Sequence, residues 1–143
     1  MRLEAHFRQM GERMLLAWGQ QVLAGESAEN IITKIDHIRE TGMTPGGWPP
    51  KGAASFTSHA ATADILLREM YQIDRESAEY LIAFAFGLSL SDMVRVMEIR
   101  NRSAANLGYK EAMAKWTMAV YYRSTQAREL MSKLDQQAKR NTA

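Results

Sequence analysis

Apolar side chains recur at intervals of three and four residues along most of the chain, and this spacing constrains the fold more than any other feature. Such spacing gives a helix one apolar face and one polar face. No segment shows the alternation of apolar and polar residues that is typical of a half-buried strand. The N-terminal segment carries the helical spacing at Leu3, Phe7, Met10, Met14, Leu15, Trp18 and Val22. The sequence therefore predicts an all-α fold with several helices.

Glycines and capping residues predict where the first two helices begin and end. We expect one helix over residues 2–24, ended by Gly25. A second helix is expected over residues 28–40, with Ser27 as its N-cap and Gly42 at its end. The apolar stripe of this second helix consists of Ile31, Ile32, Ile35 and Ile38.

A Pro/Gly-rich stretch, "TGMTPGGWPPKGAASF", follows the second helix and predicts an irregular loop over about residues 41–57, because it holds all three prolines and four of the nine glycines. Trp48 lies in this loop, and two interpretations stay open. It pins the loop onto the core, or it is an exposed contact for a partner. The loop divides the chain into an N-terminal part, 1–57, and a C-terminal part, 58–143, which together are expected to form one compact unit.

Two helices are expected next. Ser58 is placed to cap a helix that ends near Ile73 and directs these side chains inward: Ala61, Ile65, Leu66, Met70 and Tyr71. Asp74 is placed to cap the following helix, which Gly87 ends. The apolar face of that helix consists of Leu81, Ile82, Ala85 and Phe86.

A short helix and a long helix complete the chain. Ser89 or Ser91 can cap the short one, which packs through Met93, Val94, Val96 and Met97. The long C-terminal helix is expected to begin near Arg102 or Ser103, with an inner face of Ala104, Leu107, Gly108, Ala112, Trp116, Ala119 and Val120. The same period continues into the tail at Leu130, Leu134 and Ala138.

Charge is distributed unevenly, although the net charge is only +2. Residues 1–57 are neutral and residues 58–97 carry a net −3, whereas residues 98–143 hold nine Lys and Arg against four Asp and Glu. The last third can therefore face a polyanion. The alternative is that this basic segment is a solvated helix without a partner.

The residues that catalysis and metal binding require do not form recognisable groups in this sequence. There is no cysteine, and the three histidines His6, His37 and His59 have no metal-ligand spacing. No glycine loop has the spacing that binds phosphate. We therefore expect no enzymatic activity and no cofactor. Without a secretion signal or a stretch of about 18 apolar residues, we expect a cytoplasmic protein that does not enter the membrane.

The stretch "FGLSLSDMVRVMEIRNRSAANLGYKEA", residues 86–112, has the layout of a helix-turn-helix. Ile99 is the apolar residue that anchors the turn, and Ala104 and Gly108 are small enough for the second helix to approach closely. Arginine, asparagine, serine and lysine side chains suit base edges and phosphates. The predicted DNA-binding residues are Arg100, Asn101, Arg102, Ser103, Asn106, Tyr109 and Lys110.

The segment "RESAEYLIAFAFGLSLSDMVRVMEIRNRSAANLGYKEAMAKW", Arg75–Trp116, resembles the C-terminal promoter-reading module of bacterial sigma factors. The resemblance rests on the "FGLS" step, the short helix and Ile99 before the turn. The whole layout, with "MGERMLLAWG", the Pro/Gly-rich loop and "ADILLREM" before that segment, is similar to the zinc-free phage late-gene antitermination proteins called Q. This resemblance implies an all-helical protein in the host bacterial cytoplasm. It also implies three partners: double-stranded DNA near a late promoter, bacterial RNA polymerase with or without sigma factor, and nascent RNA.

Two positions depart from the sigma-like pattern. Glu98 stands where the turn glycine is usual, so we expect a different turn, with Asn101 in the left-handed region. Gly108 stands where leucine is common, so we expect the second helix to pack through Leu107. Two other function classes stay open: a helical interaction or inhibitor protein of a phage that does not bind DNA, and a repressor-type regulator that does not act on elongation.

Overall fold

Six helices make up the described part of the chain, residues 2–23, 28–41 and 57–142 of the computed structural model. They are α1 (Arg2–Leu23), α2 (Ala28–Thr41), α3 (Ser58–Ile73), α4 (Arg75–Ala85), α5 (Leu90–Val96) and α6 (Arg102–Thr142). These residues contain no strand, which confirms the all-α prediction. Among them, no helix is long and apolar enough to cross a membrane. Ser27 and Trp48, with the glycines expected to end α1 and α2, lie outside the described residues.

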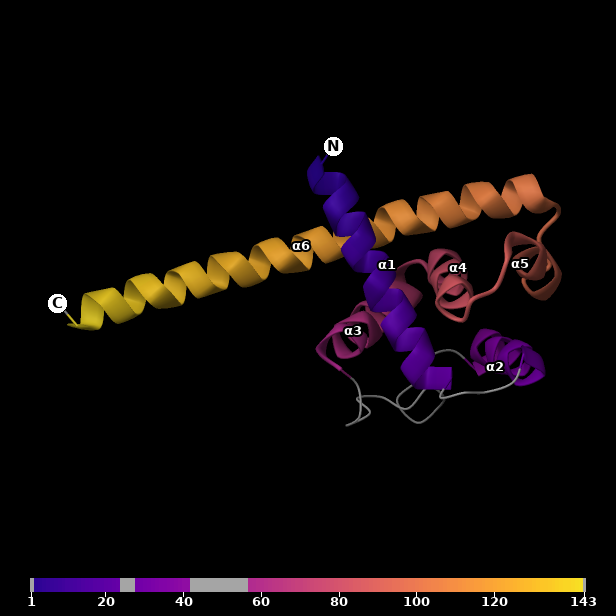
Figure 1. Ribbon diagram of the computed structural model, residues 1–143, viewed down its shortest axis with the longest axis horizontal. Coiled ribbons are helices and arrows are strands. Elements are labelled where there is room, and N and C mark those ends of the chain that lie inside the picture. Colours follow the sequence, from indigo (N-terminus) through magenta and orange to yellow (C-terminus); the bar gives the residue numbers. More distant parts are fainter. Residues whose placement is uncertain (1, 24–27, 42–56, 143) are drawn as a thin grey trace.

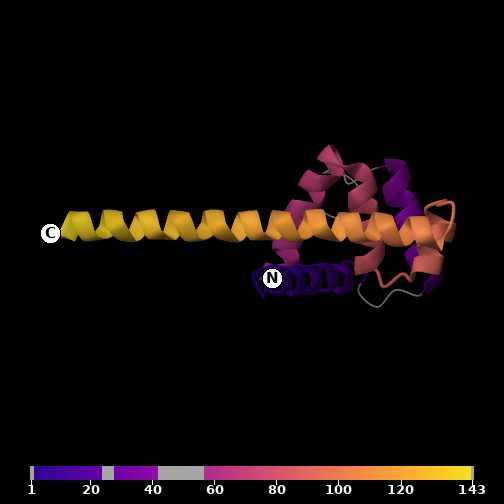
Figure 2. The ribbon, with the colours of Figure 1, turned by 90° about the horizontal axis from the view of Figure 1, so that it is seen from above.

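Helix α6 is the long axis of the molecule, and the other helices lie along its N-terminal half (Figure 1). Helix α1 crosses α6 near its middle and packs against α3, α4 and α6. Helices α5 and α2 lie at the end where α6 begins. The C-terminal half of α6 extends away from the other helices, as Figure 2 shows from above. Most of the core therefore lies between α1, α3, α4 and the first half of α6.

Two fully buried tryptophans hold the core together. The Trp18 ring stacks on Phe86 with 5.6 Å between centroids, and its indole Nε1 donates a 3.1 Å hydrogen bond to the buried Asp64 carboxylate. Trp116 Nε1 donates to the backbone oxygen of Gly11 at 2.9 Å. Both buried N–H groups thus have partners, which removes the cost of leaving a polar group unpaired in an apolar region. These contacts connect α1 to α3, α4 and α6.

The observed N-caps agree closely with the predicted ones. Asp74 caps α4 by accepting from the Ser77 N–H, and Ser89 caps α5 in a reciprocal capping box with Asp92. The cap of α3 is Thr57 rather than Ser58, because the Thr57 hydroxyl accepts from Ala60 N and Ser58 is already helical. The predicted cap was wrong by one residue, because Thr57 and Ser58 are neighbours and both are residue types that commonly cap helices.

Two side chains that were predicted to lie in the core are exposed. Ile65 of α3 is 44% exposed, because the buried face of that helix is centred on Ala60, Ala63 and Leu67. Leu107 of α6 is 59% exposed, because α6 turns Ala105, Ala112 and Trp116 toward the core. In both helices the apolar spacing fits two adjacent faces, and only packing selects one of them.

Candidate nucleic-acid interface

The region where α5 meets α6, residues 89–110, is called here the α5–α6 corner. Helix α5 has seven residues, and five residues separate its end from the start of α6. The capping box fixes the beginning of α5, with 3.2 Å from Asp92 N to Ser89 Oγ and 3.2 Å from Ser89 N to Asp92 Oδ2. Met93, Val96 and Met97 are buried beneath the corner. The corner is therefore rigidly placed on the core.

The turn of the corner is formed by a Schellman motif with a glutamate at its left-handed position. Glu98 has a φ of 55°, and the N–H of Ile99 donates to the oxygen of Val94 at 3.0 Å. Helix α4 ends in the same motif with Gly87 at a φ of 80° and Leu88 N donating to Ala83 O. Glu98 thus occupies the usual glycine position of this motif, and its Cβ makes the conformation costly.

Asn101 is the N-cap of α6 in this structure. Its Oδ1 accepts a 2.8 Å hydrogen bond from Ala104 N, and its backbone oxygen accepts from Ala105 N at 3.1 Å. The expectation that Asn101 takes the left-handed conformation was wrong, because Glu98 does so. Asn101 is exposed, but its side-chain oxygen already serves the helix start.

The second expected departure, packing through Leu107, was also wrong. Helix α6 approaches α4 so closely at Gly108 that a Cβ atom there would overlap the Tyr80 ring. Tyr80 is itself buried, so it has no open space to move into. Gly108 therefore sets the distance between α6 and α4, and the preceding residue, Leu107, faces outward.

Five of the seven predicted DNA-binding side chains lie exposed at the start of α6: the cations Arg100, Arg102 and Lys110, with Asn101 and Ser103. Within the described part of the chain, none of these three cations forms an ion pair. Ser103 and Lys110 are seven residues apart and so lie on one helix face, with Leu107 between them. Leu107 was not among the residues predicted for this face, although its spacing of four residues from Ser103 places it there.

Tyr109 lies against the body of the protein, and Asn106 lies at the border between the body and the face of Ser103 and Lys110. The Tyr109 ring packs on Phe84 with 5.7 Å between centroids, and burial raises the pKa of Tyr109. Asn106 is half-buried and lines a small hollow with Leu88, Leu90 and Met93. The structure therefore does not bring Tyr109 onto the face of Ser103 and Lys110, and it leaves Asn106 at the half-buried border of that face.

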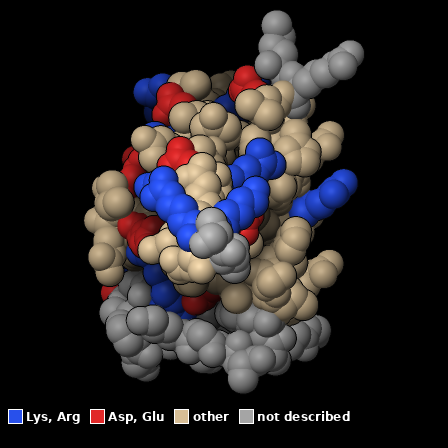
Figure 3. All heavy atoms as spheres, turned by 90° about the vertical axis from the view of Figure 1, so that its left-hand side faces the viewer, with Lys and Arg blue, Asp and Glu red and all other residues tan. Residues whose placement is uncertain are grey.

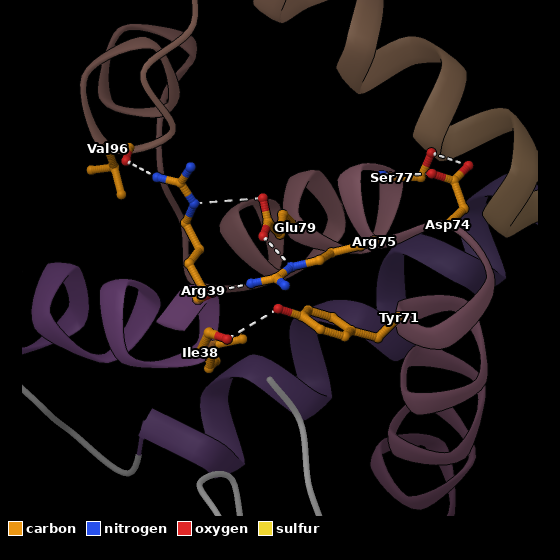
Figure 4. Close-up of polar contacts among 8 residues, drawn as sticks. All are labelled: Ile38, Arg39, Tyr71, Asp74, Arg75, Ser77, Glu79 and Val96. Atoms are coloured by element: carbon orange, nitrogen blue, oxygen red, sulfur yellow. Dashed lines mark hydrogen bonds and ion pairs between the residues drawn. The ribbon is translucent and has the colours of Figure 1, made fainter. Parts of the chain in front are cut away.

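An acid-rich hollow lies behind the corner, between α2, α4 and the end of α5. Its lining includes the carboxylates of Asp36, Glu40, Glu76, Glu79 and Glu98. Arg39 spans the hollow: its Nη1 donates to the oxygen of Val96 at 2.6 Å, and its Nε lies 3.5 Å from Glu79 (Figure 4). Arg75 bonds Glu79 and the backbone oxygen of Arg39 in the same view.

The charges of the corner are thus separated into two sides. Arg100, Arg102 and Lys110 give one side a positive charge, whereas the hollow on the other side holds five carboxylates and the two guanidinium groups of Arg39 and Arg75. Within the described residues no group of three or more His, Cys, Asp and Glu could hold a metal ion. Comparison with protein-family models, with curated proteins and with solved structures finds no match to the chain.

Proposed function

We propose that the protein binds double-stranded DNA through the α5–α6 corner, acting as a helix-turn-helix, and promotes terminator read-through by RNA polymerase. The observation that supports DNA binding is the open basic face at the start of α6. Guanidinium groups there can pair with guanine edges or phosphates, and the Ser103 hydroxyl and the Lys110 ammonium suit phosphates. Asn101 contributes less than the other polar residues, because it caps the helix.

The antitermination role rests on the resemblance of Arg75–Trp116 and of the chain layout to phage Q proteins. RNA polymerase, with or without sigma factor, and nascent RNA are the partners proposed on the same ground. A repressor-type regulator would use the same corner without affecting elongation. Transcription in vitro across a terminator separates the two roles, because only an antitermination factor increases read-through.

Gel-shift titration of phage late-promoter DNA tests the proposed corner. Arg102→Ala and Lys110→Ala should each weaken binding by about 3–30-fold, and each should reduce the salt dependence. Arg128→Ala is the matched control, since it removes one exposed cation from the projecting half of α6. Unchanged binding in both corner variants, or an equal loss in Arg128→Ala, would refute the assignment.

A second candidate function is a helical interaction protein that does not bind DNA. It is favoured by the large exposed apolar side chains of α6, among them Met118, Tyr122, Leu130, Met131 and Leu134. Under this alternative the purified protein would show no salt-dependent affinity for any DNA.

A further inference from the structure

The projecting half of α6 carries an apolar stripe that no part of the described chain covers. Leu130 is 59%, Met131 61% and Leu134 51% exposed. The spacing of these three side chains places them within about one third of the helix circumference. Burial of such side chains in a partner removes apolar surface from water and so favours binding. The stripe is therefore an uncovered apolar surface on the projecting half of this helix.

The stripe continues the face of α6 that is buried inside the bundle. Leu134 lies eighteen residues from Trp116, which is five full turns, so the two side chains point the same way. Trp116 and Val120 pack against Gly11 of α1, whereas the C-terminal half of α6 extends past α1 (Figures 1 and 2). The side chains of Ser103, Leu107 and Lys110 point to the opposite side of α6. A partner on the stripe would leave the corner open.

An apolar groove lies at the root of the stripe, where α6 leaves the bundle. Its apolar lining comes from Met10 and Met14 of α1, Leu66 of α3 and Val120 of α6, and its polar lining residues are Ser58, His59, Thr62, Arg123 and Ser124. The groove and the stripe share the same side of α6 through Val120. A helix that packs along the stripe can therefore place its end in this groove beside the Arg123 guanidinium.

The charges along the stripe indicate the kind of helix that fits. Lys133 and Arg140 follow one edge at a spacing of seven, with Glu129 four residues before Lys133 on the same edge. Residues 123–141 as a whole hold five Lys and Arg against two Asp and Glu, so the segment is basic. The other edge holds Arg128 and Asp135, which offset each other. Figure 3, which looks along α6 from its C-terminal end, shows Lys and Arg side chains standing out around the projecting helix.

A second copy of the chain is a poor match for this edge. In an antiparallel pair with the leucines in register, Lys133 would face Lys133 of the other copy, and in a parallel pair it would face Ala138. Neither arrangement pairs a cation with a carboxylate. A helix with acidic edges would place a carboxylate beside both Lys133 and Arg140.

We propose that residues 123–141 of α6 bind an amphipathic helix of another protein, with a leucine-type apolar stripe bordered by Asp or Glu. This inference rests on the exposed stripe and its basic edge and does not depend on DNA binding by the corner. The bound pair buries Leu130, Met131 and Leu134 as in a two-helix coiled coil.

Two synthetic helical peptides test the proposal with the full-length chain. Both have about four heptads with leucine at a and d, one with glutamate and the other with lysine at e and g. Fluorescence anisotropy should give at least about tenfold tighter binding of the glutamate peptide, and added salt should weaken it. Leu130→Asp with Leu134→Asp should abolish binding. Lys133→Glu with Arg140→Glu should reverse the preference between the peptides.

Because these side chains are exposed, the variants keep the folded core, which circular dichroism and thermal melting check. Arg102→Ala and Lys110→Ala should leave peptide binding unchanged, which separates this surface from the corner. The proposal is overturned if neither peptide binds or both bind equally. It is also overturned if sedimentation shows a dimer that Leu134→Asp dissociates, or if Lys133→Glu with Arg140→Glu mainly reduces binding to DNA or to anionic vesicles.

Discussion

Arg39 Nη1 donates a 2.6 Å hydrogen bond to the backbone oxygen of Val96, the last residue of α5, across 57 positions of sequence. A cation at this place satisfies one of the carbonyls that a helix leaves unpaired at its C-terminus and also complements the helix dipole. The same guanidinium lies 3.5 Å from Glu79 of α4. Helix α2 thereby connects the core helix α4 to the end of α5, directly before the turn of the corner.

Arg39→Met should lower the free energy of unfolding by about 1–2 kcal/mol, because it removes a charged hydrogen bond from a half-buried carbonyl. Urea titration measures this change. Arg95→Met is the matched control. Arg95 forms an exposed ion pair with Asp92, so this substitution should lower the free energy of unfolding by less than about 0.5 kcal/mol. Equal losses in the two variants would mean that Arg39 acts only as a surface charge.

The turn residue Glu98 makes a separate prediction. Glu98→Gly should raise the free energy of unfolding by about 0.5–1 kcal/mol, because relief of the left-handed strain exceeds the extra chain entropy of glycine. Glu98→Ala keeps the Cβ and removes the charge, so it should leave stability within about 0.5 kcal/mol of wild type. Thermal melting distinguishes them, and a stabilising Glu98→Ala would point to charge relief instead.

Helix existence could be predicted from the sequence because apolar spacing and caps are local. Asp74, Ser89 and Gly87 each signal a helix end through their own side chain or backbone, and the structure confirms all three. Facing was harder to predict. Ile65 and Leu107 lie next to the buried faces of their helices. A small rotation of a helix about its axis decides whether such a residue is buried or exposed. That rotation is set by packing against helices that are far away in sequence.

The site was predictable in outline only. Arg100, Arg102, Ser103 and Lys110 are exposed, as expected from their polarity. Tyr109 packs against Phe84, and Asn101 caps α6. The sequence alone does not distinguish these structural roles from a role in binding DNA. The polar contacts of Arg39 with Val96 and Glu79 were unpredictable, because they join three helices through tertiary packing.

Gly108 should tolerate no larger residue while Tyr80 is in place. Gly108→Ala should lower the free energy of unfolding by about 1–2 kcal/mol, since overlap with the buried ring outweighs the gain in helix propensity. Tyr80→Leu in the same chain should recover part of this loss, measured as a double-mutant cycle in urea. If the two changes are simply additive, the close approach of α6 to α4 is wrong.

Asp74 should make stability depend on pH in the acidic range. Hydrogen bonds from Lys115 and Ser77 hold the pKa of Asp74 below its ordinary value of 3.8. A lowered folded-state pKa means that this stabilisation is fully present above about pH 4 and is lost as pH falls through the folded-state value. Asp74→Asn keeps a capping side chain without the charge. The stability difference between wild type and Asp74→Asn should therefore shrink below pH 4, and a difference that stays constant would contradict this cause.

Leu107 and Lys110 should affect DNA binding in different ways, although both lie on the exposed face of α6. An ammonium pairs with phosphate in any sequence, so Lys110→Ala should weaken binding to specific and random DNA alike and reduce the salt slope by about 1. A leucine side chain can contact only apolar groups such as the thymine methyl, so Leu107→Ser should weaken binding to the preferred site by about 1–2 kcal/mol and leave the salt slope unchanged. Titrations with preferred and random duplexes at several salt concentrations measure both effects.

Ile65→Ser is the control for this test, because it removes an exposed apolar side chain from another helix. If Leu107→Ser weakened random DNA equally, the face of Ser103, Leu107 and Lys110 would bind phosphates without reading bases.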